Sequence, residues 1–473
     1  MASLPDGPSV PAAIATMRWL RDPGAMLEAC ARRYGDCFTL RLWNQPPWVV
    51  FSDPEGIKDI FTGDPALLHA GEANEVLKSV LGENSLLLMD GERHLRERRL
   101  MMPPFHGERM RAYGETMRDV ADRAIDSWPI GKPFAIHAEM QRITLEVILR
   151  TVFGLGAGPR LERMRALLVR YTALGTSRLG TALLLLMPPR YARRIGDLAM
   201  DPVRLGPFAL DLSRLLPWRE LLQVGREVDA LIYEELAERR ARASAAGDDV
   251  LTMLMAARDE AGQPMSDVEL RDELLTLLLA GHETSATSLA WAIHRILEHP
   301  EVLRALGEER DRVTGPGPLD VDQIGNLAYL DATLKETMRT RPIISIVARK
   351  LKGPMRIGGR DLPAGVVAIA CIHLAHQRAA SWPDPERFDP ARFLGKKPEP
   401  YEFFPFGGGT RRCVGMAFAL YEMKIVLAQV LRRVRLRAAP GSRVRIERRG
   451  ITLAPSGGVP VILDARLGLG LEV

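Results

Sequence analysis

The sequence has few cysteines for its length and no long apolar run. Its 473 residues include 4 cysteines, too few for a disulfide framework. The longest apolar runs, residues 274–281 and 182–187, are far shorter than the roughly 20 residues that a membrane-spanning helix needs. The N-terminus has no basic segment followed by an apolar stretch, so it does not resemble a signal peptide. We therefore expect a cytoplasmic protein with no membrane span.

A strong charge of one sign is also absent. The net charge is only +5, with 64 basic and 59 acidic residues, which does not indicate nucleic-acid binding. No Lys-Ser or Lys-Thr follows the glycines at 407–409, so a Walker-type phosphate site is excluded. The histidines His282, His373 and His376 do not have the spacing of a zinc site. We expect them to be structural or surface residues.

The most informative segment is a glycine-rich run that ends near a lone cysteine. Three glycines precede Arg411, Arg412 and Cys413, and they give the backbone freedom to curl beneath a flat ligand. A helical stretch follows at residues 416–433, and its N-terminal dipole would favour a thiolate. A thiolate held this way is a suitable axial ligand for haem iron. The alternative for an isolated cysteine is a buried structural thiol.

The spacing within this run is Phe-x-x-Gly-x-Arg-x-Cys-x-Gly, formed by Phe406, Gly409, Arg411, Cys413 and Gly415. It resembles the haem-binding signature of the cytochrome P450 superfamily at every defined position. The resemblance covers nearly the whole chain and implies one domain over residues 1–473. That domain would be mainly α with smaller β sheets, with a long central helix over the haem and the cysteine-ligand loop beneath. It implies haem b as cofactor and Cys413 as iron ligand, with Phe406 and Gly415 in the haem-binding loop.

The order of elements expected along the chain agrees with this resemblance. Residues 36–51 alternate apolar and polar side chains around Pro46-Pro47 and predict a hairpin. Residues 92–350 are mainly helical in pattern, with breaks at prolines and glycines such as Pro188-Pro189. A second hairpin is expected over residues 355–372, turning at Gly358-Gly359. Residues 381–412 are largely irregular, and residues 443–463 form short strands.

A Glu-x-x-Arg pair lies in the helical stretch at residues 327–339. Glu336 and Arg339 are three residues apart and share one helix face, so they can pair. Alone, such a pair is commonplace on protein surfaces. The resemblance implies a buried structural pair that a third arginine joins and that holds the haem-loop region. Arg387 and Arg392 are the two candidates for the third arginine, and the family's order favours Arg392.

A long helix is predicted from residue 266 to residue 299. Ser266-Asp267-Val268-Glu269 is a capping box that marks its start. In its middle, Ala280-Gly281-His282-Glu283-Thr284-Ser285 is similar to the family's oxygen-binding segment. The resemblance places Ala280 against the haem and implies that Thr284 orders a water while Glu283 relays protons from solvent. Proton delivery by a hydroxyl backed by an acid is sensible chemistry for splitting an O–O bond. Without the resemblance, these residues indicate only a close-packed helix.

Two haem carboxylates would require cationic donors, for which arginine is well suited. His94 and Arg98 are four residues apart and share one helix face. The family often has Trp or His followed by Arg at this spacing, and Arg349 and Arg411 occupy its other propionate-binding positions. The alternative for each residue is a solvated surface charge.

The implied activity is that of a haem-thiolate monooxygenase, which inserts one oxygen atom of dioxygen into an apolar small molecule. A fatty acid, terpenoid or polyketide-like substrate is expected, because the candidate pocket positions are apolar: Leu86, Leu87, Leu88, Ala280, Thr284, Ile343, Ile344, Ile346, Ile451 and Leu453. Two electrons would come from NAD(P)H through a separate ferredoxin or flavodoxin and its reductase, and the enzyme is expected to be a monomer. The alternatives are a P450-like peroxide isomerase or dehydratase, and a non-enzymatic haem-binding protein.

The electron donor is expected to dock near the cysteine. Arg96, Arg99, Arg412 and Lys424 flank the two segments that should meet there, and together they would form a positive patch. Such a patch would steer an acidic ferredoxin or flavodoxin, an effect that salt screens.

Overall fold

The structure is a computed structural model that describes residues 4–105, 107, 109–176, 203–205, 208–210, 219–241, 248–315 and 317–467. The apolar run at 182–187 and the expected break at Pro188-Pro189 lie outside these residues. No helix in the described ranges is long and apolar enough to cross a membrane.

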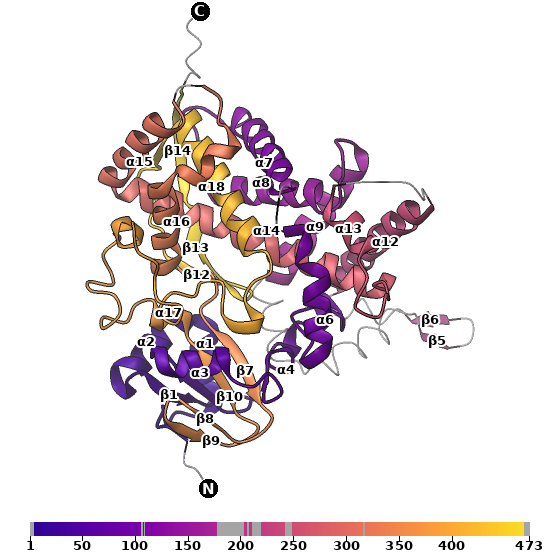
Figure 1. Ribbon diagram of the computed structural model, residues 1–473, viewed down its shortest axis with the longest axis vertical. Helices are drawn as coiled ribbons and strands as arrows, with labels where there is room; N and C mark the ends of the chain where they lie inside the picture. Colours follow the sequence, from indigo (N-terminus) through magenta and orange to yellow (C-terminus); the bar gives the residue numbers. More distant parts are fainter. Residues whose placement is uncertain are drawn as a thin grey trace, which may run out of the picture.

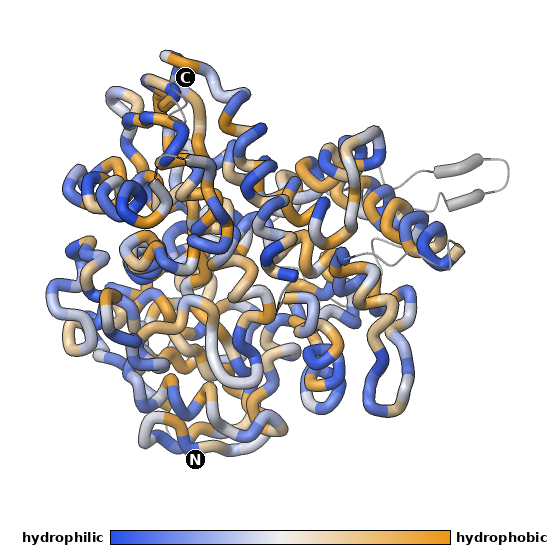
Figure 2. The backbone as a smooth tube through the Cα atoms, turned by 45° about the horizontal axis from the view of Figure 1, so that its top comes forward, coloured by the Kyte–Doolittle hydropathy of each residue, from blue (hydrophilic) through white to orange (hydrophobic). Residues whose placement is uncertain are grey.

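Helices make up most of the described chain (Figure 1). The longer ones are α1 (Ala12–Arg21), α2 (Pro23–Tyr34), α3 (Pro54–Thr62), α6 (Gly91–Met101), α7 (Arg109–Asp126), α8 (Ile136–Thr151), α9 (Pro159–Thr176), α12 (Arg219–Ala241), α13 (Val250–Ala256), α14 (Asp267–Glu298), α15 (Pro300–Val313), α16 (Ala328–Thr340) and α18 (Met416–Arg433). Short turns of helix are α4 (Ala70–Ala73), α5 (Lys78–Leu81), α17 (Ile372–Ala375) and the 3-10 turns η4 (Val321–Asn326), η5 (Pro390–Phe393) and η6 (Gly409–Arg411). Figure 2 shows apolar and polar residues interspersed along the helices.

The central element is α14, which has 32 residues and packs against α8, α16 and α18. Its start is the predicted capping box: Ser266 Oγ accepts a hydrogen bond from the Glu269 N–H at 3.3 Å, and Glu269 Oε2 accepts one from the Ser266 N–H at 2.7 Å. Leu274, Leu278 and Leu289 are fully buried in the surrounding core. The long helix predicted at residues 266–299 is thus confirmed.

The larger sheet lies toward the N-terminal end of the molecule (Figure 1). It contains β1 (Cys37–Leu40), β2 (Trp48–Phe51), β3 (Leu68–His69), β7 (Val347–Leu351) and β10 (Val367–Ala370), in the order β1-β2-β10-β7-β3. β1 and β2 pair antiparallel with Cys37 opposite Phe51, which confirms the hairpin predicted at residues 36–51.

The second predicted hairpin, over residues 355–372, is wrong in its pairing. The chain does turn at Gly358-Gly359, where φ is 53° and 72°, values that suit glycine in a tight hairpin turn. However, β8 (Met355–Ile357) pairs with β9 (Arg360–Leu362). β10 instead lies between β2, in parallel, and β7, antiparallel. Its four residues are all buried, so burial in the larger sheet, and not turn chemistry, decides its partners.

The C-terminal part forms strands as predicted. β12 (Ile446–Arg449) pairs with β13 (Thr452–Pro455), and β14 (Pro460–Arg466) lies between β11 (Val434–Ala438) and β4 (Pro133–Ala135). β4 lies within the stretch of residues 92–350 that was expected to be mainly helical. Residues 203–205 and 208–210 form a further antiparallel pair, β5 with β6.

Candidate active site

The cysteine loop runs from the irregular segment into the N-terminus of α18. The Cys413 N–H donates to the Phe406 carbonyl at 3.0 Å, and Gly415 is the N-cap residue of α18. The Cys413 side chain is solvent-accessible. Surrounding protein nevertheless raises the pKa of its thiol, an effect that the Gly415 N–H, Arg98 and Arg412 partly oppose. Desolvation therefore outweighs the helix terminus and the arginines, which were expected to favour the thiolate.

Two glycines of this loop, Gly408 and Gly409, pack closely against Phe61 in the N-terminal part of the chain. A Cβ atom at Gly408 would lie 2.3 Å from the ring of Phe61 in α3, and one at Gly409 would lie 2.0 Å from the Phe61 carbonyl oxygen. Gly409 also has φ of 63°, which disfavours other residues. Close packing on α3, besides backbone freedom, therefore requires glycine here.

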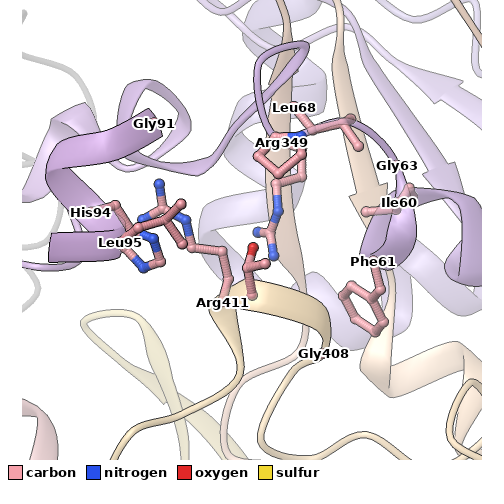
Figure 3. Close-up of a pocket in the computed structure, with 12 residues that line it drawn as sticks. Ile60, Phe61, Gly63, Leu68, Gly91, His94, Leu95, Arg349, Gly408 and Arg411 are labelled. Atoms are coloured by element: carbon pink, nitrogen blue, oxygen red, sulfur yellow. The ribbon is translucent and has the colours of Figure 1, made fainter. Parts of the chain in front are cut away.

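A cluster of cationic side chains lies beside the loop. His94, Arg349 and Arg411 point into one pocket, whose empty volume of about 400 Å³ is partly open to solvent (Figure 3). The Arg349 guanidinium donates to the Ala348 carbonyl at 2.9 Å, and no carboxylate pairs with it in the described part of the chain. Burial and the Arg411 charge lower the pKa of Arg349 to about 10. A buried guanidinium without a carboxylate is costly, so this pocket suits an anion.

Arg411 lines this pocket, and Arg98 is near enough for its charge to act on His94 and Arg411, but both arginines also make bonds within the protein. Arg98 donates to the Arg412 carbonyl at 2.7 Å. Arg411 donates to the Leu86 carbonyl at 3.2 Å and to the Asp90 carboxylate at 2.6 Å. Asp90 was not recognised in the sequence. Burial and the positive charges of Arg411, Arg98 and Arg349 lower the pKa of His94 to about 3. The three arginines outnumber Asp90, so the cluster still carries more positive than negative charge.

One stripe in the middle of α14 stays accessible although the helix is buried on its other sides. Between residues 272 and 293, the accessible side chains are Leu277, Leu279, Ala280, Gly281 and Thr284. Four of them recur at spacings of three and four, so they share one helix face. Gly281 on this face lies close to α8, since a Cβ atom there would be 2.6 Å from the Ile148 side chain. Thr284 Oγ1 donates to the Ala280 carbonyl at 2.7 Å, which leaves its oxygen able to accept a hydrogen bond.

Glu283 points away from this stripe, toward α8 and β12. Its Oε2 atom accepts a hydrogen bond from Gln141 at 2.5 Å, and its Oε1 atom lies 4.0 Å from both His137 and Arg449. Glu283 is only 5% exposed, whereas the Arg449 side chain is 32% exposed. Burial, and then the charge of Arg449, lower the pKa of His137 to about 4, despite the opposing Glu283 carboxylate. The three partners of Glu283 had no sequence signal, because they come from distant segments.

The Glu-x-x-Arg pair is fully buried and doubly bonded. Arg339 Nε and Nη2 donate to the two Glu336 oxygens at 2.7 Å each. Arg392 Nε lies 3.6 Å from Glu336 Oε1, whereas Arg387 offers its main-chain carbonyl to Arg339 at 3.1 Å. The side chain that reaches Glu336 is thus that of Arg392, the residue chosen from the sequence.

The apolar positions expected to line a substrate pocket lie in four separate segments, of which the one in α14 is described above. Leu86, Leu87 and Leu88 lie beside the cysteine loop, since the Leu86 carbonyl accepts a bond from Arg411. The Leu453 N–H donates to the Ile343 carbonyl at 2.8 Å, which joins the segment of Ile343, Ile344 and Ile346 to the β12–β13 hairpin. Ile451, at the turn of that hairpin, is 48% exposed.

The three histidines were expected to be structural or surface residues, and all three are buried. His282 is buried and bonds the Leu278 carbonyl at 2.6 Å, while His373 pairs with Glu28 at 2.9 Å. His376 is fully buried. No group of three or more metal-ligating side chains occurs in the described ranges.

Comparisons with known proteins agree with this geometry. A sequence model of the family described as Cytochrome P450 matches residues 5–459. A protein of Mycobacterium bovis named cytochrome P450 135B1 is 40% identical over 463 residues, covering 98% of this chain and 92% of its own length. A protein of Mycobacterium tuberculosis named cytochrome P450 135A1 is 36% identical over 478 residues, covering 99% and 96%.

Two solved structures share the fold. The retinoic acid-bound cyanobacterial CYP120A1 superposes with a TM-score of 0.77 at 23% identity, over 98% of this chain and 100% of that one. The haem domain of cytochrome P450DA gives a TM-score of 0.80 at 22% identity, over 99% of both chains.

A mainly helical fold built around α14, with a cysteine loop and a cationic cluster, is that of a haem monooxygenase. The chain belongs to the cytochrome P450 family. Membership implies a haem cofactor, dioxygen as co-substrate and redox partners that supply electrons. The residues fit the cofactor: a haem carries two carboxylates, and the cluster of His94, Arg98, Arg349 and Arg411 holds buried positive charge that matches them.

Proposed function

We propose that the cofactor is haem b, with Cys413 as its iron ligand and with His94, Arg98, Arg349 and Arg411 around its propionates. Phe406 and Gly415 would shape the loop that holds the haem, and Ala280 would contact the haem from α14. The observation that carries this proposal is the buried Arg349, which has no carboxylate partner in the described chain and lies beside the cysteine loop.

The reaction that this site supports is insertion of one oxygen atom into a C–H bond or alkene. The second atom of dioxygen leaves as water, which consumes two electrons and two protons. Thr284 would accept a hydrogen bond from a water beside α14 and hold it for proton transfer. Glu283 would supply protons through its contacts with Gln141, His137 and Arg449, of which Arg449 reaches the surface.

We propose a hydrophobic small molecule as substrate, such as a fatty acid, terpenoid or polyketide-like compound. The accessible stripe of α14 consists of Leu277, Leu279, Ala280, Gly281 and Thr284, with no charged side chain. Ile343 and Leu453, joined by a main-chain hydrogen bond, add apolar surface. These side chains favour binding by burial of apolar area.

The electron donor in this proposal is a ferredoxin or flavodoxin served by a reductase that oxidises NAD(P)H in the cytoplasm. The expected positive patch needs correction, because three of its four members are paired with acids. Arg96 lies 2.7 Å from Asp259 and 3.3 Å from Glu269, Arg99 pairs with Glu260, and Lys424 lies 3.4 Å from Asp331. Arg412 alone of the four has no ion pair in the described ranges, so electrostatic steering and its salt dependence should be modest.

The test is the spectrum of the reduced, carbon monoxide-bound holoenzyme, followed by turnover. The wild type should show the red-shifted Soret band of thiolate ligation, and Cys413→Ser should lose it. Cys30→Ser, Cys37→Ser and Cys371→Ser are matched controls and should keep it. Oxygenated product formed from dioxygen and NAD(P)H with a partner ferredoxin would support a monooxygenase. A normal thiolate spectrum in Cys413→Ser would refute the assignment.

A further inference from the structure

A second hollow lies away from the cysteine loop, between the C-terminal ends of α14 and α18, the helix α15 and the strand β11. Its empty volume is about 1260 Å³, part of which is open to solvent. Buried side chains from each element form its walls, among them Ile293, Ile296, Leu306, Leu330 and Val434. Protein interiors are close-packed, so a hollow of this size with apolar walls is a candidate for a ligand site.

This hollow shares no lining residue with the pocket of His94, Arg349 and Arg411. It is therefore not part of the site already described. Residues 468–473 follow Leu467, which lines the hollow, and lie outside the described ranges.

One buried arginine in the wall has unused hydrogen-bonding capacity. Arg432, in the last turn of α18, is 7% exposed, and its Nη1 atom donates to Thr314 Oγ1 at 3.1 Å. Its Nε atom has no hydrogen-bond partner, and no carboxylate lies within ion-pairing distance of its guanidinium, in the part of the chain that the structure describes. The Asp122 carboxylate instead forms an ion pair with the next residue, Arg433, at 2.9 Å.

Three other charged side chains line the hollow: Glu309, Arg310 and the exposed Arg435. Glu309 accepts hydrogen bonds from the N–H groups of Tyr329 and Leu330 at 2.6 and 2.9 Å, so its charge is held at the start of α16. Arg310 lies 2.7 Å from the exposed Asp311. Arg432 is therefore the buried cation available to a ligand within the hollow, with Arg310 and Arg435 adding positive potential near it.

We propose that this hollow binds a single-chain amphiphile with a carboxylate head group, of the fatty-acid type, independently of the haem site. The alkyl chain lies against the leucine and isoleucine walls, where burial of apolar surface favours it. The carboxylate pairs with the Arg432 guanidinium, whose fork suits two carboxylate oxygens.

The test uses the holoenzyme with its haem site blocked by an azole that coordinates the iron, which absorbance monitors throughout. Equilibrium dialysis with radiolabelled dodecanoate should then show one molecule bound per chain without displacement of the azole. Arg432→Gln should weaken this binding by about 10-fold or more, because a hydrogen-bonded charge pair is lost. Arg312→Gln, which removes an exposed arginine of the neighbouring helix α15, is the matched control and should bind like the wild type.

A second variant fills the hollow and leaves the Arg432 charge in place. Gly307 lines it from α15, and a Cβ atom there would meet nothing within 4 Å. Gly307→Phe should therefore fold, retain the haem spectrum and exclude dodecanoate. Dodecyltrimethylammonium should bind more weakly than dodecanoate to the wild type.

Three results would overturn the proposal. The first is dodecanoate binding that persists in both Arg432→Gln and Gly307→Phe. The second is binding that occurs only when the azole is displaced, which would place all of it in the haem cavity. The third is binding that requires deletion of residues 468–473, which would assign the hollow to the chain's own end. None of these depends on which substrate the haem site oxidises.

Discussion

The imidazole of His376 accepts a hydrogen bond on Nε2 from the main-chain N–H of Phe404, at 3.0 Å. The ring is fully buried, and burial, with the nearby Arg339 charge, lowers its pKa to about 3. It is therefore neutral at physiological pH, as an acceptor nitrogen must be. The His376 carbonyl also accepts a bond from Arg339 at 2.9 Å. One residue thus connects the buried Glu336–Arg339 pair to the start of the cysteine loop.

His376→Phe should loosen the cysteine loop. Phenylalanine keeps the ring packing against Phe403 but leaves the Phe404 N–H without its acceptor, at a cost of about 1–3 kcal/mol. Faster haem transfer to apomyoglobin and a lower free energy of unfolding are expected. His373→Phe is the control, because His373, in the short helix α17 that ends just before His376, pairs with Glu28 and not with the loop. Equal haem loss in the two variants would contradict this role.

Glu336→Ala should prevent stable haem incorporation. Removing one partner of a fully buried pair leaves the Arg339 charge uncompensated, which typically costs about 3–5 kcal/mol. The ratio of haem absorbance to protein concentration measures the loss. Arg392→Ala should have a smaller effect, because its Nε atom is 3.6 Å from Glu336. Arg387→Ala should be nearly silent, because Arg387 contributes its main-chain carbonyl. A fully haem-loaded Glu336→Ala variant would disprove the role.

Thr284→Ala should uncouple oxygen consumption from product formation while leaving the carbon monoxide spectrum unchanged. The variant loses the hydroxyl that bonds the Ala280 carbonyl and that is proposed to hold the proton-donating water. Product formed per NAD(P)H should fall, with more hydrogen peroxide or water released. Thr284→Ser retains the hydroxyl and should retain most of the coupling. Unchanged product yield in Thr284→Ala would refute the proton-transfer role.

Glu422 should make the protein less stable as pH rises. This carboxyl in α18 is fully buried, and burial raises its pKa from 4.5 to about 8, although the nearby Ser285 hydroxyl opposes the shift. Neither of its oxygens has a hydrogen bond of ordinary geometry in the described part of the chain. The unfolded chain releases the proton above pH 4.5 while the folded protein keeps it until about pH 8, so stability falls across that window.

Glu422→Gln should remove this dependence. The variant and the wild type should be similar near pH 4.5, and the variant should be more stable at pH 8, by a margin on the order of a few kcal/mol. Urea unfolding at a series of pH values, followed by circular dichroism, measures the difference. Glu308→Gln, an exposed substitution on α15, serves as the control. Parallel pH profiles for the wild type and Glu422→Gln would exclude this account.

The sequence correctly predicted those features that depend only on residues close together in the chain. The capping box at Ser266, the first hairpin and the turn at Gly358-Gly359 depend on neighbouring residues, and each is present. The pairing of β10 was missed because its partners, β2 and β7, are chosen by burial in a sheet built from distant segments. The same limit applies to charge. Arg96 is basic in sequence, yet Asp259 and Glu269 neutralise it across more than a hundred residues.

The contact between Phe61 and the glycines 408 and 409 has a consequence for biosynthesis. One wall of the cysteine loop is made early during translation, and the loop itself is made late. A ribosome must therefore add most of the chain before the two surfaces can meet. Nascent chains that end before Phe404 should capture no haem through the cysteine, and cofactor loading should begin only when the polypeptide is almost complete.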